Sequence, residues 1–140
     1  MADRDAELEA LTNAFWTVAR RLRHGSRQTL APFDLAPSHS RALGTLLRRG
    51  AMRLGALADL LGIAARSATE VVDALEERGL VERTPDPSDR RATLVVPTDE
   101  GRELMLRIRE ARLAETDELF ARLSAQDRAE LTRMLLALDE

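Results

Sequence analysis

A chain of 140 residues suits one domain of ordinary size, and its 44% hydrophobic residues are enough to fill a core. The absence of cysteine excludes a disulfide framework, a thiolate metal site and a cysteine redox sensor. No apolar run approaches the ~20 residues that span a bilayer, and residues 1–5 lack the basic and apolar parts of a signal peptide. We therefore expect a cytoplasmic protein without a membrane segment.

The net charge of −3 does not by itself indicate a nucleic-acid ligand, so its distribution along the chain matters more. Residues 1–34 carry 5 Arg and 5 acidic residues, residues 35–92 carry 9 and 8, and residues 93–140 carry 7 and 11. The middle of the chain is thus its only positive part, although an excess of one charge decides nothing.

In chain order, the first predicted helix begins near Leu8, from which apolar residues recur at steps of three and four. Pro32 ends the stretch that this helix can occupy. A second helix is predicted from Pro37, a residue suited to the first helical position, to Gly50. The apolar residues are Leu8, Leu11, Phe15, Val18 and Leu22 in the first helix, and Leu43, Leu46 and Leu47 in the second.

Two short helices separated by a break at Gly62 are predicted next, and they form a helix-turn-helix outline. The first ends at Gly62, and the second runs from about Ala65 to Arg78, where Gly79 stops it. Its expected buried face is Ala68, Val71, Val72 and Leu75.

After Gly79 the hydrophobic period changes to that of strands. Residues 81–84 and 92–96 are predicted to form a β-hairpin, whose loop at residues 85–91 is rich in turn formers and has a basic tip. Thr98 then caps a helix with an acidic first turn, and Ser124 starts the last helix. The predicted fold is mainly α with one small β-hairpin.

The second helix of the helix-turn-helix, the recognition helix, carries the first candidate DNA contacts. A helix with side chains fits the major groove of B-DNA, about 12 Å wide, and its N-terminal residues meet base edges. Here those residues are Arg66, which can bind guanine, Ser67 and Thr69, which can meet bases or phosphates, and Glu70, which can accept from cytosine. Taken alone, a helical pair that merely packs and exposes a solvated face remains the simpler interpretation.

The hairpin tip carries the second set of candidates. Arg90 and Arg91 can reach past the backbone into a narrow minor groove, where the negative potential is enhanced. Asp89 repels phosphate unless it holds an arginine, and its spacing of two residues from Arg91 lets the pair share one face. The alternative is an exposed ion pair worth ~0–1 kcal/mol.

The order of these parts, helix-turn-helix followed by strand, basic tip and strand, resembles that of the multiple antibiotic resistance regulator (MarR) family. The motifs that carry the resemblance are a leucine-glycine turn in residues 57–63, the pattern VDxLExRGLVxR within residues 71–83, the DRR of residues 89–91 and the LTxxG-like residues 98–101.

The resemblance implies a winged helix-turn-helix flanked by terminal dimerisation helices. Within a single domain of residues 1–140, it assigns DNA binding to residues 37–97 and dimerisation to residues 1–32 and 98–140. It also implies that Arg91 enters the minor groove, that Asp89 orients Arg91, and that Arg90 contacts phosphate. We expect a homodimeric, sequence-specific repressor of a pseudo-palindromic duplex that a small molecule or pH releases.

Several residues depart from the family pattern. Ala36 and Ala64 stand where members often have a capping Ser or Thr, a loss of ~1 kcal/mol per cap. Glu70 and Ala74 replace residues that are often basic, so the recognition helix is less positive than usual. These residues and the net charge keep an alternative open, a winged-helix adaptor for protein partners that has lost DNA binding.

Few residues indicate any other chemistry. Family members hold small aromatic ligands near the first helix, so Trp16 can line an effector pocket, although packing is the favoured interpretation for Trp16. His24 and His39 are too few for a zinc site, and Ser38 and Ser67 lack an activating histidine pattern. We expect no catalytic site, no metal and no cofactor.

Overall fold

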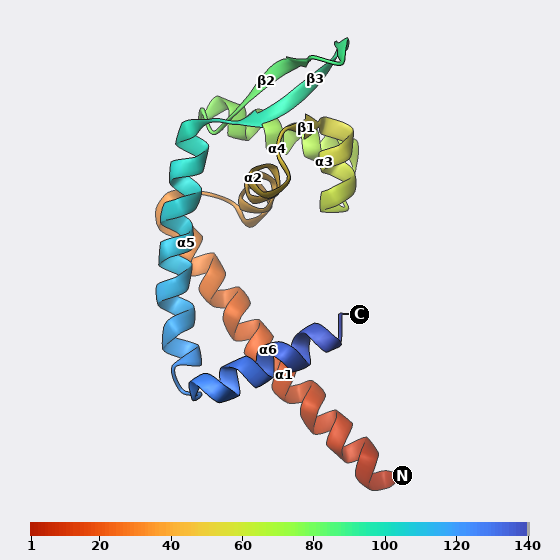
Figure 1. Ribbon diagram of the computed structural model, residues 1–140, viewed down its shortest axis with the longest axis vertical. Helices are drawn as coiled ribbons and strands as arrows, with labels where there is room; N and C mark the ends of the chain where they lie inside the picture. Colours follow the sequence, from red (N-terminus) through yellow and green to blue (C-terminus); the bar gives the residue numbers. More distant parts are fainter. Residues whose placement is uncertain (140) are drawn as a thin grey trace. The chain divides into compact units, whose positions relative to one another are not determined.

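The computed structural model describes residues 1–139, whose elements are shown in Figure 1. The elements are α1 (Ala2–Leu30), a 3-10 turn (Ala31–Phe33), α2 (Pro37–Arg49), β1 (Met52–Arg53), α3 (Leu54–Leu61), α4 (Ala65–Glu77), β2 (Val81–Asp86), β3 (Asp89–Pro97), α5 (Asp99–Phe120) and α6 (Ala125–Ala137). The expected fold class, mainly α with a small antiparallel sheet, is confirmed.

The chain divides into two compact units. One is Arg27–Arg109, and the other combines Met1–Ser26 with the chain from Glu110 onward. The division falls inside α1 and α5 rather than between elements. The assignment of residues 37–97 to DNA binding and of the flanking helices to dimerisation stays a prediction.

Local signals place the helix ends of the Arg27–Arg109 unit. Gly62 ends α3 with a φ of 66°, a left-handed conformation that glycine adopts without steric cost. Ala36 and Ala64 precede α2 and α4 without a side-chain cap bond. At α5, by contrast, the hydroxyl of Thr98 accepts a hydrogen bond from the backbone N of Gly101 at 3.1 Å, which confirms the predicted cap.

The hairpin is longer than the sequence predicts, and the small sheet has a third strand. The strand order is β1-β3-β2, all antiparallel, and the two-residue β1 was not expected. The predicted loop at residues 85–91 is wrong in extent, because β2 continues to Asp86 and β3 begins at Asp89. Pro85 is tolerated because β2 is an edge strand, and the register shifts between Pro85 and Asp86.

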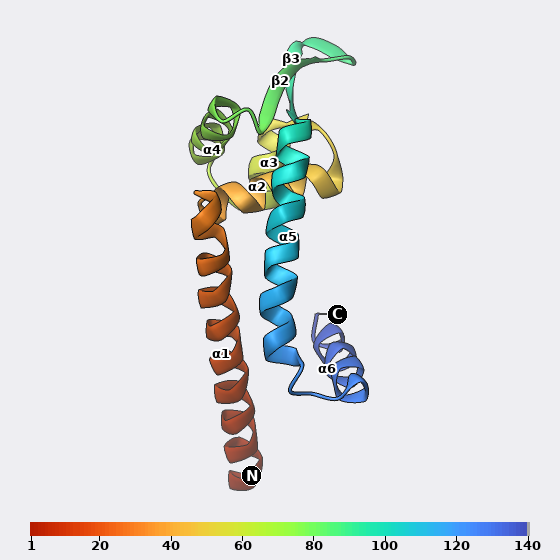
Figure 2. The ribbon, with the colours of Figure 1, turned by 90° about the vertical axis from the view of Figure 1, so that its left-hand side faces the viewer.

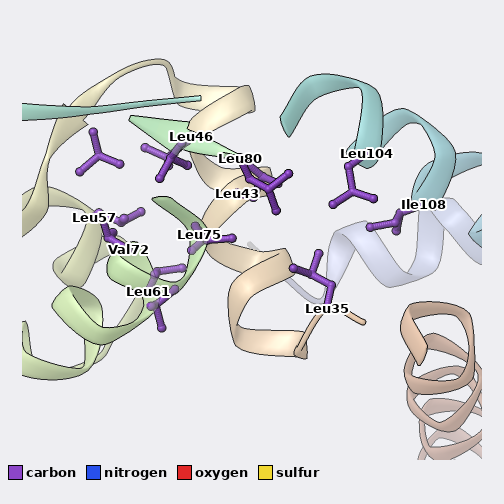
Figure 3. Close-up of a cluster of buried hydrophobic side chains, with 14 of the residues drawn as sticks. Leu35, Leu43, Leu46, Leu57, Leu61, Val72, Leu75, Leu80, Leu104 and Ile108 are labelled. Atoms are coloured by element: carbon purple, nitrogen blue, oxygen red, sulfur yellow. The ribbon is translucent and has the colours of Figure 1, made fainter. Parts of the chain in front are cut away.

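One hydrophobic core fixes the helix-turn-helix against the hairpin (Figure 3). Its largest fully buried side chains come from α2 (Leu43, Leu46), α3 (Leu57), α4 (Val72, Leu75), the two long strands (Val81, Val95) and α5 (Ile108). The predicted buried face of α4 is confirmed. In both views the β2–β3 hairpin, residues 81–97 and hereafter the wing, extends away from α2, α3 and α4 (Figure 1 and Figure 2).

Gly101 is required by close packing rather than by its backbone angles. A Cβ added to Gly101 would collide with the backbone carbonyl oxygen of Leu80 and lie 3.2 Å from the side chain of Leu43. The start of α5 therefore lies directly against the turn between α4 and β2. Because glycine has no side chain, α5 can pack closely against this turn and contribute to the core of the unit.

Candidate nucleic-acid interface

The N-terminal turn of α4 presents polar side chains to solvent while its opposite face is anchored. Arg66, Ser67 and Glu70 are exposed, whereas Ala68 between them is fully buried. The Nε of Arg66 lies 3.7 Å from Glu70 Oε1, with the two side chains 92% and 71% exposed. An ion pair this open separates at little cost, so both groups remain available to a ligand.

Thr69 differs from its neighbours because its hydroxyl is already used. It is only partly exposed and donates a hydrogen bond to the carbonyl oxygen of Ala65 at 3.0 Å. Within α4, the hydroxyl oxygen keeps its ability to accept a hydrogen bond, and the methyl group can contact apolar atoms. Thr69 is thus better suited to accepting or to apolar contact than to donating.

The C-terminal end of α3 is bonded by an arginine from α2. Arg41 Nη2 donates to the backbone carbonyl oxygen of Leu61 at 2.9 Å and so satisfies a carbonyl group at the C-terminal end of α3. This contact joins α2 to the end of α3, directly before the turn that leads to α4.

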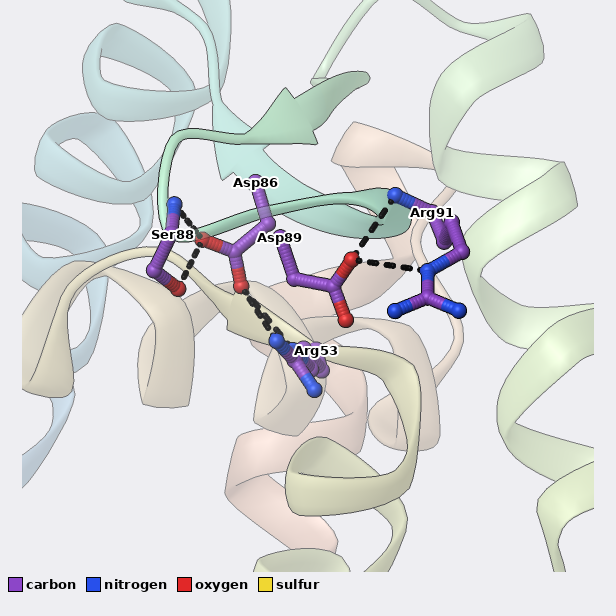
Figure 4. Close-up of polar contacts among 5 residues, drawn as sticks. All are labelled: Arg53, Asp86, Ser88, Asp89 and Arg91. Carbon is purple, nitrogen blue, oxygen red and sulfur yellow. Dashed lines mark hydrogen bonds and ion pairs between the residues drawn. The ribbon is translucent and has the colours of Figure 1, made fainter.

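The wing tip, residues 86–91, exposes the side chain of Arg91 to solvent, and Asp89 contacts Arg91 (Figure 4). Asp89 Oδ1 accepts a hydrogen bond from the backbone N of Arg91 at 3.1 Å and lies 3.5 Å from Arg91 Nε. The Arg91 side chain is 95% exposed. The predicted pairing is present, and neighbouring Arg90 is also exposed.

A second carboxylate, which the sequence interpretation missed, anchors the base of this tip. Asp86 is buried, and its Oδ1 accepts hydrogen bonds from the backbone N and hydroxyl of Ser88 at 2.9 and 2.8 Å. Its Oδ2 lies 2.9 Å from both Nε and Nη2 of Arg53, which directly precedes α3 (Figure 4). The hydrogen bonds from Ser88, and then the pairing with Arg53, hold the pKa of Asp86 below its ordinary value.

This anchor connects the wing to the helix-turn-helix. The local pattern Asp86-Pro87-Ser88 is typical of a turn in which an aspartate bonds the backbone two residues later, and that signal was available in the sequence. The contact with Arg53 joins residues 33 positions apart, and no local pattern indicates it.

Comparison with known proteins identifies the arrangement. The sequence model of the MarR family matches residues 35–93, which contain α2, α3, α4 and most of the wing. The uncharacterised HTH-type transcriptional regulator Mb0904 of Mycobacterium bovis is 37% identical over 131 residues, 93% of this chain and 87% of the relative. The HTH-type transcriptional regulator MhqR of Bacillus subtilis is 35% identical over 101 residues, 72% and 70% of the two chains.

The chain belongs to the MarR family. A solved MarR family protein from Bacillus stearothermophilus has the same fold, with a TM-score of 0.88 and 22% identity, covering 96% of this chain and 94% of that one. The resemblance inferred from the sequence motifs is therefore confirmed. The protein is a transcriptional regulator with a DNA-binding helix-turn-helix fold, and its family and relatives are regulators rather than enzymes.

Other parts of this MarR-family chain give weaker indications of a functional site. Trp16, on α1, is 49% exposed and packs edge-on against Phe15, with ring centroids 5.8 Å apart. An open hollow of about 660 Å³ is lined by residues between Arg27 and Pro37, and Trp16 lies outside that lining. Over the described residues 1–139, no helix is long and apolar enough to cross a membrane, and no cluster of three His, Asp or Glu side chains could hold a metal ion.

Proposed function

We propose that this MarR-family regulator is a homodimeric repressor that binds a short pseudo-palindromic duplex in the cytoplasm. The recognition helix α4 enters the major groove and the wing tip enters the adjacent minor groove. The observation that carries the proposal is Arg91, whose side chain is 95% exposed at the end of a projecting hairpin and is paired with Asp89. A guanidinium presented in this way suits the negative potential of a narrow minor groove.

In this arrangement each candidate residue has a distinct role. Arg66 binds a guanine edge in the major groove, and Glu70 accepts from a cytosine amino group once it separates from Arg66. Ser67 contacts a base or a phosphate, and Thr69 accepts a hydrogen bond or meets a thymine methyl group. In the wing tip, Arg90 contacts backbone phosphate, which contributes affinity without sequence preference.

Exposed apolar side chains on the terminal helices support the homodimer. On α1, Leu8, Leu11, Phe15 and Val18 are 49%, 64%, 49% and 41% exposed in the single chain. The exposed apolar residues of α6 include Met134, Leu135 and Leu136, and exposed Leu138 directly follows the helix. Large apolar side chains exposed in such a row are typical of an interface, and a second copy with two-fold symmetry places two recognition helices on two half-sites.

We further propose that a small aromatic effector, or a change of pH, releases the protein from DNA. Trp16 is the candidate contact for the effector, because its half-exposed indole offers a flat apolar face and an N–H donor. Its edge-on contact with Phe15 equally suits packing in the dimer, which is the competing role.

Selection of DNA tests the proposal directly. Duplexes recovered from a random-sequence library by the full-length chain should contain an inverted repeat, with half-sites about 10–10.5 base pairs apart or a multiple of that spacing. Sedimentation of the free protein should give twice the 15.6 kDa of one chain. Recovery of no common sequence, or a stable folded monomer at micromolar concentration, would refute the proposal.

A further inference from the structure

Arg83 connects the recognition helix to the wing. It lies in β2, and its guanidinium reaches across to two carboxylates on α4. Arg83 Nη2 donates to Asp73 Oδ1 at 2.6 Å, and Nη1 donates to Glu76 Oε1 at 2.8 Å. The backbone N of Arg83 donates to the other oxygen of Glu76 at 3.0 Å. Three hydrogen bonds thus join one residue of β2 to neighbouring turns of α4.

This bridge is more ordered than an ordinary surface ion pair. The Arg83 side chain is only 29% exposed, compared with 95% for Arg91 at the wing tip. The hydrogen bond to Asp73, followed by the contacts with Glu76, raises the pKa of Arg83 above its ordinary value. A planar guanidinium held on two sides by carboxylates has a fixed orientation, which a lysine ammonium cannot reproduce.

The position of the bridge gives it a role beyond stability. Asp73 lies three residues after Glu70, so it belongs to the turn that follows the candidate groove contacts. Arg83 lies in the strand that leads to the wing tip with Asp89 and Arg91. A bridge between these points holds the major-groove element and the minor-groove element at one separation.

We propose that Arg83 is a positioning residue that fixes the wing relative to α4, so that the protein accepts only one spacing between its major-groove and minor-groove contacts. This inference rests on the proposed mode of DNA binding. One base pair advances the duplex by about 3.4 Å. With a fixed wing, a shift of that size removes the contact of Arg91, whereas a loosened wing follows the groove.

The test compares spacing preference rather than affinity alone. The probe is a duplex selected by the wild-type chain, together with versions that carry one base pair inserted or deleted between the two contacted segments of each half-site. Interference by dimethyl sulfate locates these segments, because the reagent modifies guanine N7 in the major groove and adenine N3 in the minor groove. The spacing ratio is the dissociation constant on the altered duplex divided by that on the parent.

Two kinds of variant separate positioning from charge. Arg83→Met keeps an apolar stem but removes a positive charge, so absolute affinity should fall. The double variant Asp73→Ala with Glu76→Ala removes both hydrogen-bond acceptors and two negative charges, so absolute affinity should rise or hold. Both lose the bridge, and both should therefore lower the spacing ratio. Arg83→Lys should restore part of the ratio, because one ammonium can hold one of the two carboxylates.

We expect a wild-type ratio of about tenfold or more per half-site, comparable to the loss of one specific contact, and a ratio below about threefold without the bridge. Arg102→Met is the matched control, because it removes an arginine whose hydrogen bond and ion pair are made with Asp99 on α5 rather than with α4 or the wing. It should keep the wild-type ratio.

The outcomes distinguish this inference from the proposed function. If the wild-type chain selects no duplex, the proposed function fails and the inference fails with it. If the wild-type chain binds and both bridge variants keep its ratio, or if the wild-type chain accepts all spacings equally, DNA binding stands and the role of Arg83 is wrong. Circular dichroism of each variant confirms that it is folded, and the double variant provides the test should Arg83→Met unfold.

Discussion

Removal of the Asp89 side chain sets two effects on DNA affinity against each other. In the proposed mode of binding, the carboxylate orders Arg91 before docking, but it also repels phosphate. The ordering can be bounded from the structure, since Asp89 Oδ1 lies 3.5 Å from Arg91 Nε and the arginine side chain is 95% exposed. An ion pair this exposed contributes ~0–1 kcal/mol, and fixing a long side chain at an interface costs about 0.5–1.5 kcal/mol.

We expect ordering to dominate, so Asp89→Ala should weaken binding by about twofold to fivefold per half-site, the equivalent of at most about 1 kcal/mol. Asp89→Asn is the matched control, because its amide oxygen can still accept from the backbone N of Arg91 while the charge is gone. It should therefore bind more tightly than Asp89→Ala. The assay is fluorescence anisotropy on one selected duplex at about 0.15 M salt, where the Debye length is about 8 Å.

Tighter binding by Asp89→Ala than by the wild type would refute this reasoning, because it would show that relief of repulsion exceeds any benefit of ordering Arg91. Equal binding by the alanine and asparagine variants would show that the hydrogen bond within the wing tip contributes nothing to the interaction with DNA.

The remaining predictions concern packing, pH and base preference. Gly101→Ala should lower the free energy of unfolding in urea by about 1–3 kcal/mol or more, because its Cβ would collide with the Leu80 carbonyl oxygen; Gly55→Ala, whose Cβ meets nothing within 4 Å, should raise it by up to about 1 kcal/mol. The pKa of Asp86 is lowered in the folded state, so the stabilisation by its carboxylate is complete above the ordinary aspartate pKa of about 4 and is lost as the pH falls below that value. The difference in melting temperature between the wild type and Asp86→Asn should therefore be smaller at about pH 3 than at about pH 7. Glu70→Gln should change base preference within a half-site or raise affinity for all duplexes in parallel titrations, and no change in either would show that Glu70 only faces solvent.

The sequence predicts the helices of the Arg27–Arg109 unit well because their ends depend on local chemistry. Gly62 stops α3 by adopting a left-handed conformation, Pro37 begins α2, and the hydroxyl of Thr98 caps α5. Each signal acts within a few residues and needs no partner from elsewhere in the chain. The buried face of α4 follows in the same way from the helical period of its apolar residues.

The wing was predicted less completely because its extent depends on pairing between distant residues. Proline and aspartate at positions 85–86 favour a loop locally, but pairing with β3 extends β2 through them. Strand β1 has two residues and gains its structure only by pairing Met52 with Val95 and Arg53 with Leu94. A run this short has no alternating pattern that a sequence can display.

Long-range polar contacts also could not be predicted from the sequence. Arg53 and Asp86 are 33 residues apart, and both resemble ordinary solvated charges until the sheet brings them together. Arg83 lies within a recognised family motif, but its contacts with Asp73 and Glu76 depend on how β2 crosses α4. The motif glycine at position 101 likewise gains a physical reason only from its contact with Leu80.

The most direct measurement of the central claim compares Arg91→Ala with Arg90→Ala on one selected duplex over a range of salt. The account predicts that Arg91→Ala costs ~1–3 kcal/mol per half-site, and most where A·T steps narrow the minor groove. Arg90→Ala should weaken all sequences alike and reduce the magnitude of the salt slope by about one per subunit. Circular dichroism should be unchanged in both, since the two side chains are exposed. Unaltered affinity and sequence preference in a folded Arg91→Ala protein would contradict the account.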